Sequence, residues 1–178
     1  MRNRILIVDD EPHVLRSLVR TLMDEDYEVM TTTSGEEALE LVQRYKFKVV
    51  ISDERMPGMY GSELLSTISV RQPEAVKMLL TGYASVEAAI RAVNEGEIYR
   101  FLVKPWDDFE LKMAIRSGIE KHDMEMKNRK LQALVRTQYY RLHGCSGTTP
   151  TELEMQTLFT EMTEEEIDKL IKECGVDA

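Results

Sequence analysis

The chain has few of the residues that would stabilise a small secreted domain or hold a protein in a membrane. Only two of its 178 residues are cysteine, Cys145 and Cys174, and neither belongs to a Cys-x-x-Cys pair. A disulfide framework and a structural zinc site therefore have little support, and a reducing compartment suits the composition. No apolar run approaches the ~18 residues of a membrane span, and the four apolar residues after Arg4 are too few for a signal peptide. We expect a cytoplasmic protein without membrane association.

Basic residues are also scarce. The chain has 23 Lys and Arg against 32 Asp and Glu, a net charge of −9. Most of this excess lies in residues 151–178, where nine acidic residues and two lysines give −7. Such a charge repels phosphate and opposes non-specific attraction to nucleic acid. We therefore predict no direct nucleic-acid binding by this chain and no DNA-reading helix-turn-helix at its C-terminus.

Short apolar runs alternate with amphipathic segments along the first part of the chain. Strands and helices that alternate at this spacing predict an α/β fold with a doubly wound parallel sheet of five strands. The apolar runs that we interpret as strands are 5–8, 27–31, 49–51, 76–80 and 99–103. The amphipathic segments that we interpret as helices are 12–24, 35–45, 61–70 and 85–95, with a further helix from about Asp107.

The sequence beyond the last predicted strand indicates an extended helix and a small helical tail. Helix-compatible sequence continues from Phe109 to about Leu142, roughly 50 Å at 1.5 Å per residue. A faint heptad pattern in its second half is compatible with a coiled coil. Gly, Ser, Thr and Pro then mark a loop. Two short acidic helices are expected after it, the second with a capping-box pattern at Thr163 and Glu166. The predicted segments are a domain at 1–125, an extended helix or linker at 126–142, a loop at 143–150 and an acidic helical segment at 151–178.

Chemically active side chains follow four of the five predicted strands. In a sheet of order 2-1-3-4-5, the ends of strands 1 and 3 flank the switch point, so their carboxylates should converge there. Mg²⁺ would relieve the repulsion between them, since it prefers one or two carboxylates with water and phosphate oxygens. A nearby lysine and hydroxyl would stabilise a transferring phosphoryl group. These side chains are Asp9, Asp10 and Glu11 after the first strand, Asp53 after the third, Thr81 after the fourth and Lys104 after the fifth.

Asp53 is the candidate nucleophile of this group. A carboxylate oxygen can attack phosphorus in line and form an acyl phosphate. Pro57, Gly58 and Gly61 follow Asp53 and supply the residue types that a sharp exit from a strand needs. We therefore predict a phosphoacceptor site at the end of the third strand.

Four motifs in this order resemble the receiver domains of bacterial two-component response regulators. The resemblance covers roughly 3–125 and implies a flavodoxin-like fold in which a sensor histidine kinase phosphorylates Asp53. It also implies that Asp10, Asp53 and the backbone carbonyl of Arg55 ligate Mg²⁺, with Asp9 nearby through water. The motifs are Ile5 to Glu11, Ser52 to Gly58, Leu80-Thr81-Gly82 and Phe101 to Trp106.

The same resemblance implies a conformational switch. Lys104 would pair with the phosphoryl group, and the Lys104-Pro105 peptide bond would be cis. Thr81 would move toward the phosphate while Phe101 turns inward. The chain would then be a phosphoacceptor signalling domain, limited to self-catalysed phosphotransfer and slow autodephosphorylation, and no other enzyme activity is expected of it.

The switch is expected to act on a distant surface. That surface is formed by the helix 85–95, the strand 99–103 and the helix from Asp107, and it would control homodimerisation or binding of an output partner that the sequence does not identify. Arg55 and Tyr83 flank the predicted phosphoryl position, and we expect them to tune the lifetime of the phosphorylated state. The chain could also be the front portion of a longer regulator.

Two other interpretations explain part of the pattern. A haloacid-dehalogenase-like phosphatase also uses an aspartate nucleophile, Mg²⁺, a hydroxyl and a lysine on a doubly wound sheet. Its nucleophile, however, lies in an Asp-x-Asp arrangement after the first strand, whereas Asp9 and Asp10 are adjacent and the isolated aspartate is Asp53. The third interpretation is an interaction module whose acidic site is degenerate, and the presence of Asp53, Thr81 and Lys104 argues against it.

Overall fold

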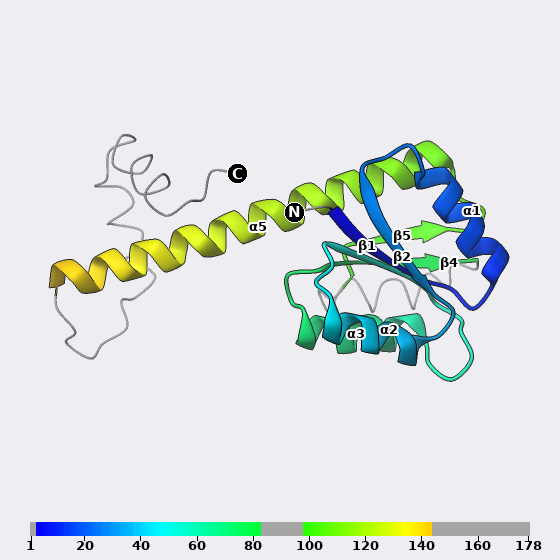
Figure 1. The fold of residues 1–178 in the computed structure, drawn as a ribbon, viewed down its shortest axis with the longest axis horizontal. Helices are drawn as coiled ribbons and strands as arrows, with labels where there is room; N and C mark the ends of the chain where they lie inside the picture. Colours follow the sequence, from blue (N-terminus) through cyan, green and yellow to red (C-terminus); the bar gives the residue numbers. More distant parts are fainter. Residues whose placement is uncertain (1–2, 83–97, 144–178) are drawn as a thin grey trace. The chain divides into compact units, whose positions relative to one another are not determined.

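The computed structural model describes residues 3–82 and 98–143, the last ten of these by their backbone alone (Figure 1). The chain divides into two compact units, Met1–His122 and Asp123–Ala178. None of the described helices combines the length and the apolar character that a membrane crossing needs. Several predicted features lie outside the described residues, namely Tyr83, the helix 85–95, the loop after His143, both cysteines and the acidic segment 151–178.

A parallel sheet of five strands forms the centre of the first unit (Figure 1). Its order is β2-β1-β3-β4-β5, which confirms the order predicted from the sequence. Every residue of β3 is buried, as expected of a central parallel strand covered on both faces. The strands are β1 (Asn3–Val8), β2 (Tyr27–Thr32), β3 (Val49–Asp53), β4 (Val76–Thr81) and β5 (Arg100–Val103).

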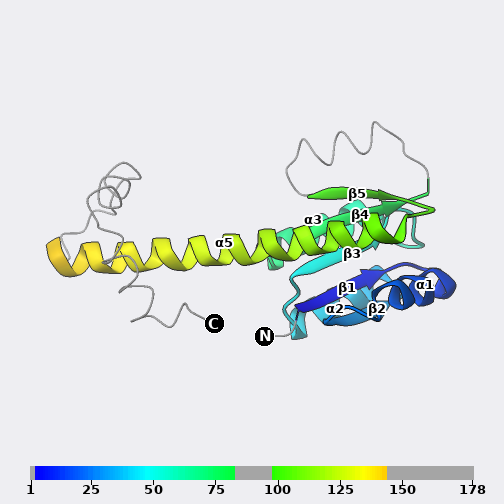
Figure 2. The ribbon, with the colours of Figure 1, turned by 90° about the horizontal axis from the view of Figure 1, so that it is seen from above.

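Helices cover both faces of the sheet, because the crossovers between parallel strands are right-handed. Figures 1 and 2 place α1 and the first part of α5 on one face, and α2 and α3 on the other. Two apolar cores result, one beneath α1 and α5 and one beneath α2 and α3. The described helices are α1 (Pro12–Leu22), α2 (Gly35–Arg44), α3 (Gly61–Arg71) and α5 (Asp108–His143).

Side chains cap the starts of α2 and α5. Asp107 precedes α5, and its Oδ1 accepts the backbone N–H of Glu110 at 2.9 Å. Ser34 caps α2 in the same way by accepting the N–H of Glu37 at 3.2 Å. The long helix predicted after Asp107 is present and contains 36 residues. A side-chain oxygen at each start satisfies an N–H group that has no partner within the helix.

Candidate functional site at the carboxyl ends of the strands

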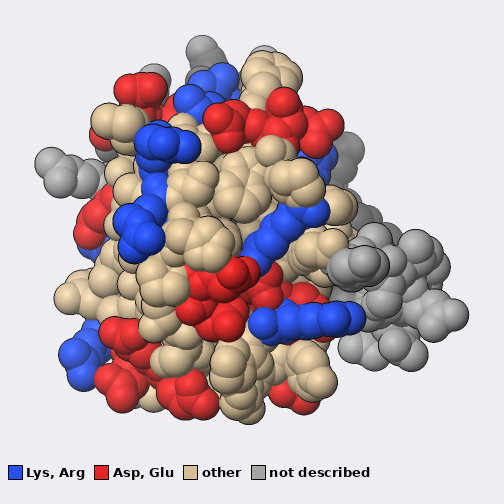
Figure 3. Space-filling model, turned by 90° about the vertical axis from the view of Figure 1, so that its right-hand side faces the viewer, with Lys and Arg blue, Asp and Glu red and all other residues tan. Residues whose placement is uncertain are grey.

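Two buried carboxylates lie at the carboxyl ends of neighbouring strands. Asp9 directly follows β1 and is 0% exposed, and Asp53 is the last residue of β3 and is 6% exposed. Val8 and Ser52 are paired in the register of these strands, so the next residue of each strand reaches the same point of the sheet edge. Figure 3 shows this face of the molecule, with a group of acidic side chains near its centre and basic side chains beside it.

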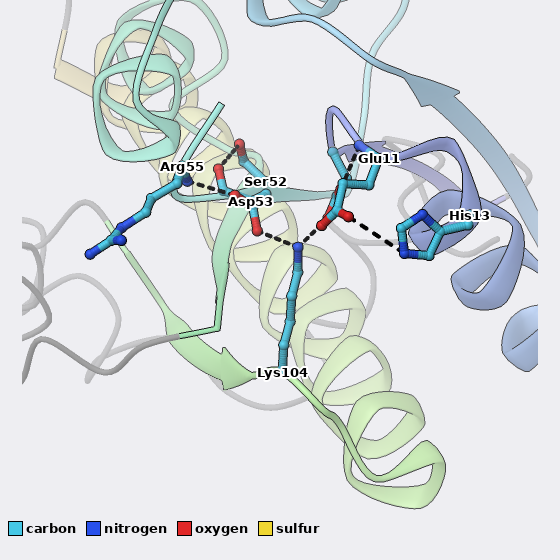
Figure 4. A network of polar contacts seen from close by, with 7 residues as sticks. Glu11, His13, Ser52, Asp53, Arg55 and Lys104 are labelled. Carbon is cyan, nitrogen blue, oxygen red and sulfur yellow. Dashed lines mark hydrogen bonds and ion pairs between the residues drawn. The ribbon is translucent and has the colours of Figure 1, made fainter. Parts of the chain in front are cut away.

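Lys104 lies between the two carboxylates (Figure 4). Its Nζ is 2.6 Å from Asp9 Oδ2 and forms a second ion pair with Asp53 Oδ1. The lysine is placed by the end of β5, where its backbone N–H donates to the Thr81 carbonyl at 2.8 Å. The Lys104-Pro105 peptide bond is cis, as the sequence resemblance implies. The structure thus brings Asp9, Asp53 and Lys104 into direct contact.

The second oxygen of each carboxylate is held by the backbone. Asp9 Oδ1 accepts the N–H of Glu11 at 3.0 Å, and Asp53 Oδ2 accepts the N–H of Arg55 at 2.5 Å. Each aspartate therefore forms a short turn with the residue two positions later, a conformation that Asp side chains favour. Both carboxylates are fixed with one oxygen toward the backbone and the other toward Lys104.

Burial and charge change the proton affinities of this group in a consistent way. Removal from water raises the pKa of the Asp9 carboxyl above 3.8, although its hydrogen bonds with Lys104 and Glu11 act in the opposite direction. Burial also disfavours the charged Lys104 ammonium, but its hydrogen bonds with Asp53 and Asp9 outweigh this and raise its pKa above 10.5. Lys104 is therefore fully protonated at neutral pH, while the ionised form of Asp9 is disfavoured by folding.

Asp9→Asn is expected to make the protein more stable at pH 7. A carboxyl whose pKa is raised by folding contributes stability below its unfolded value of 3.8, and this contribution is lost as the pH rises through the folded value. A neutral amide of the same shape removes that loss, so we expect the free energy of unfolding to rise by about 0.5–2 kcal/mol. Urea unfolding of the wild type and Asp9→Asn at pH 7 and below pH 4 measures this difference in free energy. The increase should appear at pH 7 and be absent below pH 4.

The exposed Asp26 provides the matched control for this substitution. Asp26→Asn removes the same charge from the surface and should change the free energy of unfolding by no more than about 0.5 kcal/mol. A loss of stability in Asp9→Asn at pH 7 would show that its ion pair with Lys104 outweighs the cost of its burial.

The donor set of the pocket fits Mg²⁺. Carboxylate oxygens are hard ligands, and Mg²⁺ usually takes one or two of them and completes its shell with water and phosphate oxygens. Asp9 and Asp53 are buried side by side, and the half-buried Asp10 is next in the chain. Among the described side chains, no group of three or more His, Cys, Asp or Glu residues is arranged to hold a metal ion by itself. A cation bound to the carboxylates of this pocket would need further ligands, such as the water and phosphate oxygens that Mg²⁺ prefers.

The other residues predicted for the site lie around this pocket. Thr81 is the half-buried last residue of β4, and its carbonyl is tied to Lys104. Phe101 on β5 is partly buried and packs against the core beneath α2 and α3. The Arg55 side chain is exposed and points away from the Asp53 carboxylate (Figure 4). In this conformation only the Arg55 backbone contacts the site, so its guanidinium does not cover Asp53.

The structure gives contacts of Glu54 and Gly61 beside the site that the sequence interpretation did not predict. The Glu54 carboxylate accepts the N–H of Ser62 at 3.0 Å and its Oγ–H at 3.1 Å, which links the two ends of the loop after Asp53. At Gly61, a Cβ atom would overlap the backbone oxygen of Asp53 and lie 2.8 Å from its carbonyl carbon. The glycine was visible in the sequence as a turn residue, but no local pattern indicates that Glu54 contacts a residue eight positions later.

Comparisons with known proteins agree with this geometry. The family model of the response regulator receiver domain matches residues 5–116. The hydrogenase transcriptional regulatory protein HoxA of Cupriavidus necator is 37% identical over 133 residues, which are 75% of this chain and 27% of that protein. The chain spans only 26% to 29% of the length of this and similar curated relatives.

Solved structures show the same architecture. A CheY-like response regulator receiver domain protein from Methanospirillum hungatei JF-1 superposes with a TM-score of 0.66 and 31% identity, over 70% of this chain and 99% of that one. The beryllofluoride-activated NtrC4 receiver domain dimer gives a TM-score of 0.64 and 31% identity, over 67% of this chain and 98% of that one. These similarities extend over the sheet and the helices that carry the pocket.

Proposed function

Because this chain belongs to the family of response regulator receiver domains, a signalling family of two-component systems, we propose that a sensor histidine kinase phosphorylates it on Asp53. The observation that supports this is the contact of the Asp53 carboxylate with Lys104 at the carboxyl ends of the strands. Ligands of doubly wound sheets bind at this edge. The family assignment also argues against the alternative interpretation as a haloacid-dehalogenase-like phosphatase.

The chemistry is an in-line transfer to a carboxylate. A carboxylate oxygen of Asp53 attacks phosphorus, and a new P–O bond forms while the P–N bond to the histidine of the kinase breaks. The electron pair of that bond stays on the imidazole nitrogen, which can then take up a proton. Lys104 and the Thr81 hydroxyl are the groups that we propose to stabilise the charge on the equatorial phosphoryl oxygens.

The charge of the pocket supports the proposal that phosphorylation requires a divalent cation. Asp9 and Asp53 face a single positive group, Lys104, and Asp10 adds a third carboxylate next to Asp9 in the chain, so the pocket repels an anionic phosphoryl donor. Asp10, Asp53 and the carbonyl of Arg55 are the residues that we propose as Mg²⁺ ligands, with Asp9 nearby. Bound there, Mg²⁺ would neutralise charge on the phosphoryl oxygens and hold them close to Asp53.

Output requires an element with two states that phosphorylation can bias. We propose Thr81 and Phe101 for this role, since Thr81 ends β4 beside the pocket and Phe101 is only partly buried. The altered surface would control homodimerisation or an output partner, and the NtrC4 receiver dimer is a structural relative in which such an assembly is known.

The organisation that we propose keeps the receiver at 1–125, followed by the extended helix or linker 126–142, the loop 143–150 and the acidic segment 151–178. We also propose that this protein is cytoplasmic, where a sensor histidine kinase would serve as its phosphodonor. The much greater length of the curated relatives supports the proposal that this receiver controls output domains of a longer regulator.

Intact-mass measurement after incubation with acetyl phosphate and Mg²⁺ tests the proposed function. The wild-type chain should gain the mass of one phosphoryl group, and Asp53→Asn should gain none because an amide cannot form the acyl phosphate. Asp26→Asn serves as the surface control and should label like the wild type. An unlabelled wild-type chain would revive the degenerate interaction module, and a labelled Asp53→Asn would place the phosphoacceptor elsewhere.

A further inference from the structure

Glu54 joins both ends of the loop that follows the phosphoacceptor. Its backbone N–H donates to the Leu80 carbonyl at 2.9 Å, and its carbonyl accepts the N–H of Gly61 at 3.0 Å. Its carboxylate accepts the N–H and the Oγ–H of Ser62 at 3.0 and 3.1 Å. Four hydrogen bonds of one residue therefore tie the loop 55–60 to the end of β4 and to the first turn of α3.

The loop held in this way carries backbone groups of the pocket. Arg55 is bonded directly to Glu54, and its N–H is the donor to Asp53 Oδ2 at 2.5 Å. Arg55 also pairs with Tyr60 in an isolated bridge, and Gly58 at the tip of the loop has a φ of 84°. A displacement of the loop therefore moves the peptide groups on both sides of Arg55.

The carboxylate suits its place at the start of α3. Ser62 is the second residue of that helix, so its N–H has no acceptor within the helix. A negative charge near a helix N-terminus is also favourable. Glu54 is only half-buried, and its carboxylate reaches Ser62 from a residue outside the helix. The contact thus links the helix to the phosphoacceptor strand.

We propose that Glu54 is a positioning residue for the metal and phosphoryl site. By holding Ser62 it fixes the backbone of Arg55 against Asp53, and it thereby presents the Arg55 carbonyl and the Asp53 carboxylate to the cation in a constant geometry. This inference rests on the proposed function, because it assigns Glu54 a role in the Mg²⁺ affinity of that same site.

Mg²⁺ titration of three variants tests the role of the carboxylate. Trp106 is the only tryptophan of the chain and lies two residues after Lys104, so its fluorescence reports on the pocket. Glu54→Ala should raise the Kd for Mg²⁺ about 10-fold, the lower limit usual for groups that orient metal ligands. Glu54→Gln should stay close to the wild type, because the amide oxygen can accept the Ser62 N–H and the amide N–H can donate to Ser62 Oγ.

The pair of Glu54 variants separates positioning from charge. Both remove one negative charge near the cation, so an electrostatic effect would weaken Mg²⁺ binding equally in the two. Ser62→Ala removes only the Oγ–H bond and should give a smaller loss than Glu54→Ala. If Glu54→Ala does not fold, an unchanged Kd in Ser62→Ala overturns the proposal.

Amide hydrogen exchange of the metal-free protein gives an independent measurement. The N–H groups of Gly61 and Ser62 should exchange faster in Glu54→Ala and at wild-type rates in Glu54→Gln, since exchange reports local opening. A Kd for Mg²⁺ within twofold of the wild type in Glu54→Ala, or equal losses in Glu54→Ala and Glu54→Gln, would overturn the positioning role. A wild-type chain that binds no Mg²⁺ at all would instead contradict the proposed function.

Discussion

Lys104→Met is expected to slow the phosphorylation of Asp53 by acetyl phosphate about 100-fold or more, the usual loss when one donor to a developing negative charge is removed. Lys104 is the cation that directly contacts the Asp53 carboxylate in the described part of the chain. Methionine keeps much of the volume of the lysine stem but supplies no charge and no N–H donor. The initial rate of labelling at saturating Mg²⁺, followed by intact mass, measures the effect.

The same substitution should also lower stability. Without Lys104, the carboxylates of Asp9 and Asp53 face each other in a pocket from which water is largely excluded, and the lysine itself is only 18% exposed. Removing one partner of such a pair leaves uncompensated buried charge, and we expect a loss of about 2 kcal/mol at pH 7 because some screening remains. The pKa of Lys104 is raised, so its contribution is fully present below pH 10.5 and is lost as the pH rises through the folded value.

A surface lysine provides the control for this prediction. Lys46 forms an ion pair with Glu74 at 3.2 Å but is 74% exposed, so Lys46→Met should change stability by no more than about 0.5 kcal/mol. The double variant Asp9→Asn with Lys104→Met should regain part of the lost stability without regaining the rate. A wild-type labelling rate in Lys104→Met would show that Lys104 does not contribute to the proposed phosphoryl transfer.

Gly61→Ala is expected to destabilise the protein by about 3 kcal/mol, the upper end of the usual cost of overpacking. An added Cβ would overlap the backbone oxygen of Asp53 and lie 2.9 Å from Ser52 Oγ. Neither neighbour can move easily, because β3 is buried and hydrogen-bonded on both sides. The displacement that relieves the overlap must therefore occur in the loop after Asp53. We expect slower phosphorylation together with a lower urea midpoint.

Gly82 offers a matched glycine on the same edge of the sheet. A Cβ there would meet nothing within 4 Å, so Gly82→Ala should leave the urea midpoint nearly unchanged. Equal stability of Gly61→Ala and Gly82→Ala would mean that the loop accommodates the methyl group without cost. The comparison therefore isolates the steric contact from the general effect of replacing glycine.

The sheet could be predicted from the sequence because β1, β3 and β4 are rich in buried apolar residues, whereas β2 gives a weaker signal. The run 49–51 is followed in the structure by Ser52 and Asp53, which extend β3 by two polar residues. An apolar pattern cannot indicate such an extension, since the added residues are stabilised by pairing with β4. For the same reason, the exact end of the strand that carries the candidate nucleophile could be determined only from the fold.

The distinct positions of Asp9 and Asp10 could not be read from their adjacency. The sequence presents two equivalent acidic residues after a strand, but successive residues of an extended chain point in opposite directions. Asp9 consequently faces Lys104 and is fully buried, while Asp10 is half-buried. The contact between Glu54 and Ser62 was hidden for a similar reason, since it depends on how the loop closes in three dimensions.

The end of the compact receiver unit also depends on packing. The helical pattern continues without a break from Asp108 to His143, so it contains no signal for a boundary. Ile119 is the last buried apolar residue of α5 among the residues whose burial is described, and the first unit ends at His122. A boundary at 125 was therefore only a prediction from the extent of the family resemblance.

The paired turns at Asp9 and Asp53 have a consequence for the kinetics of the cation binding that we propose for this pocket. Each carboxylate is already immobilised by an N–H two residues later, so its conformational entropy is lost during folding rather than on ligand binding. The group that a cation would displace is the ammonium of one lysine, Lys104, which serves as an internal counter-ion of both carboxylates. Entry and release of the cation should then involve little reorganisation of the backbone, and the pocket can reset as quickly as one side chain changes its rotamer.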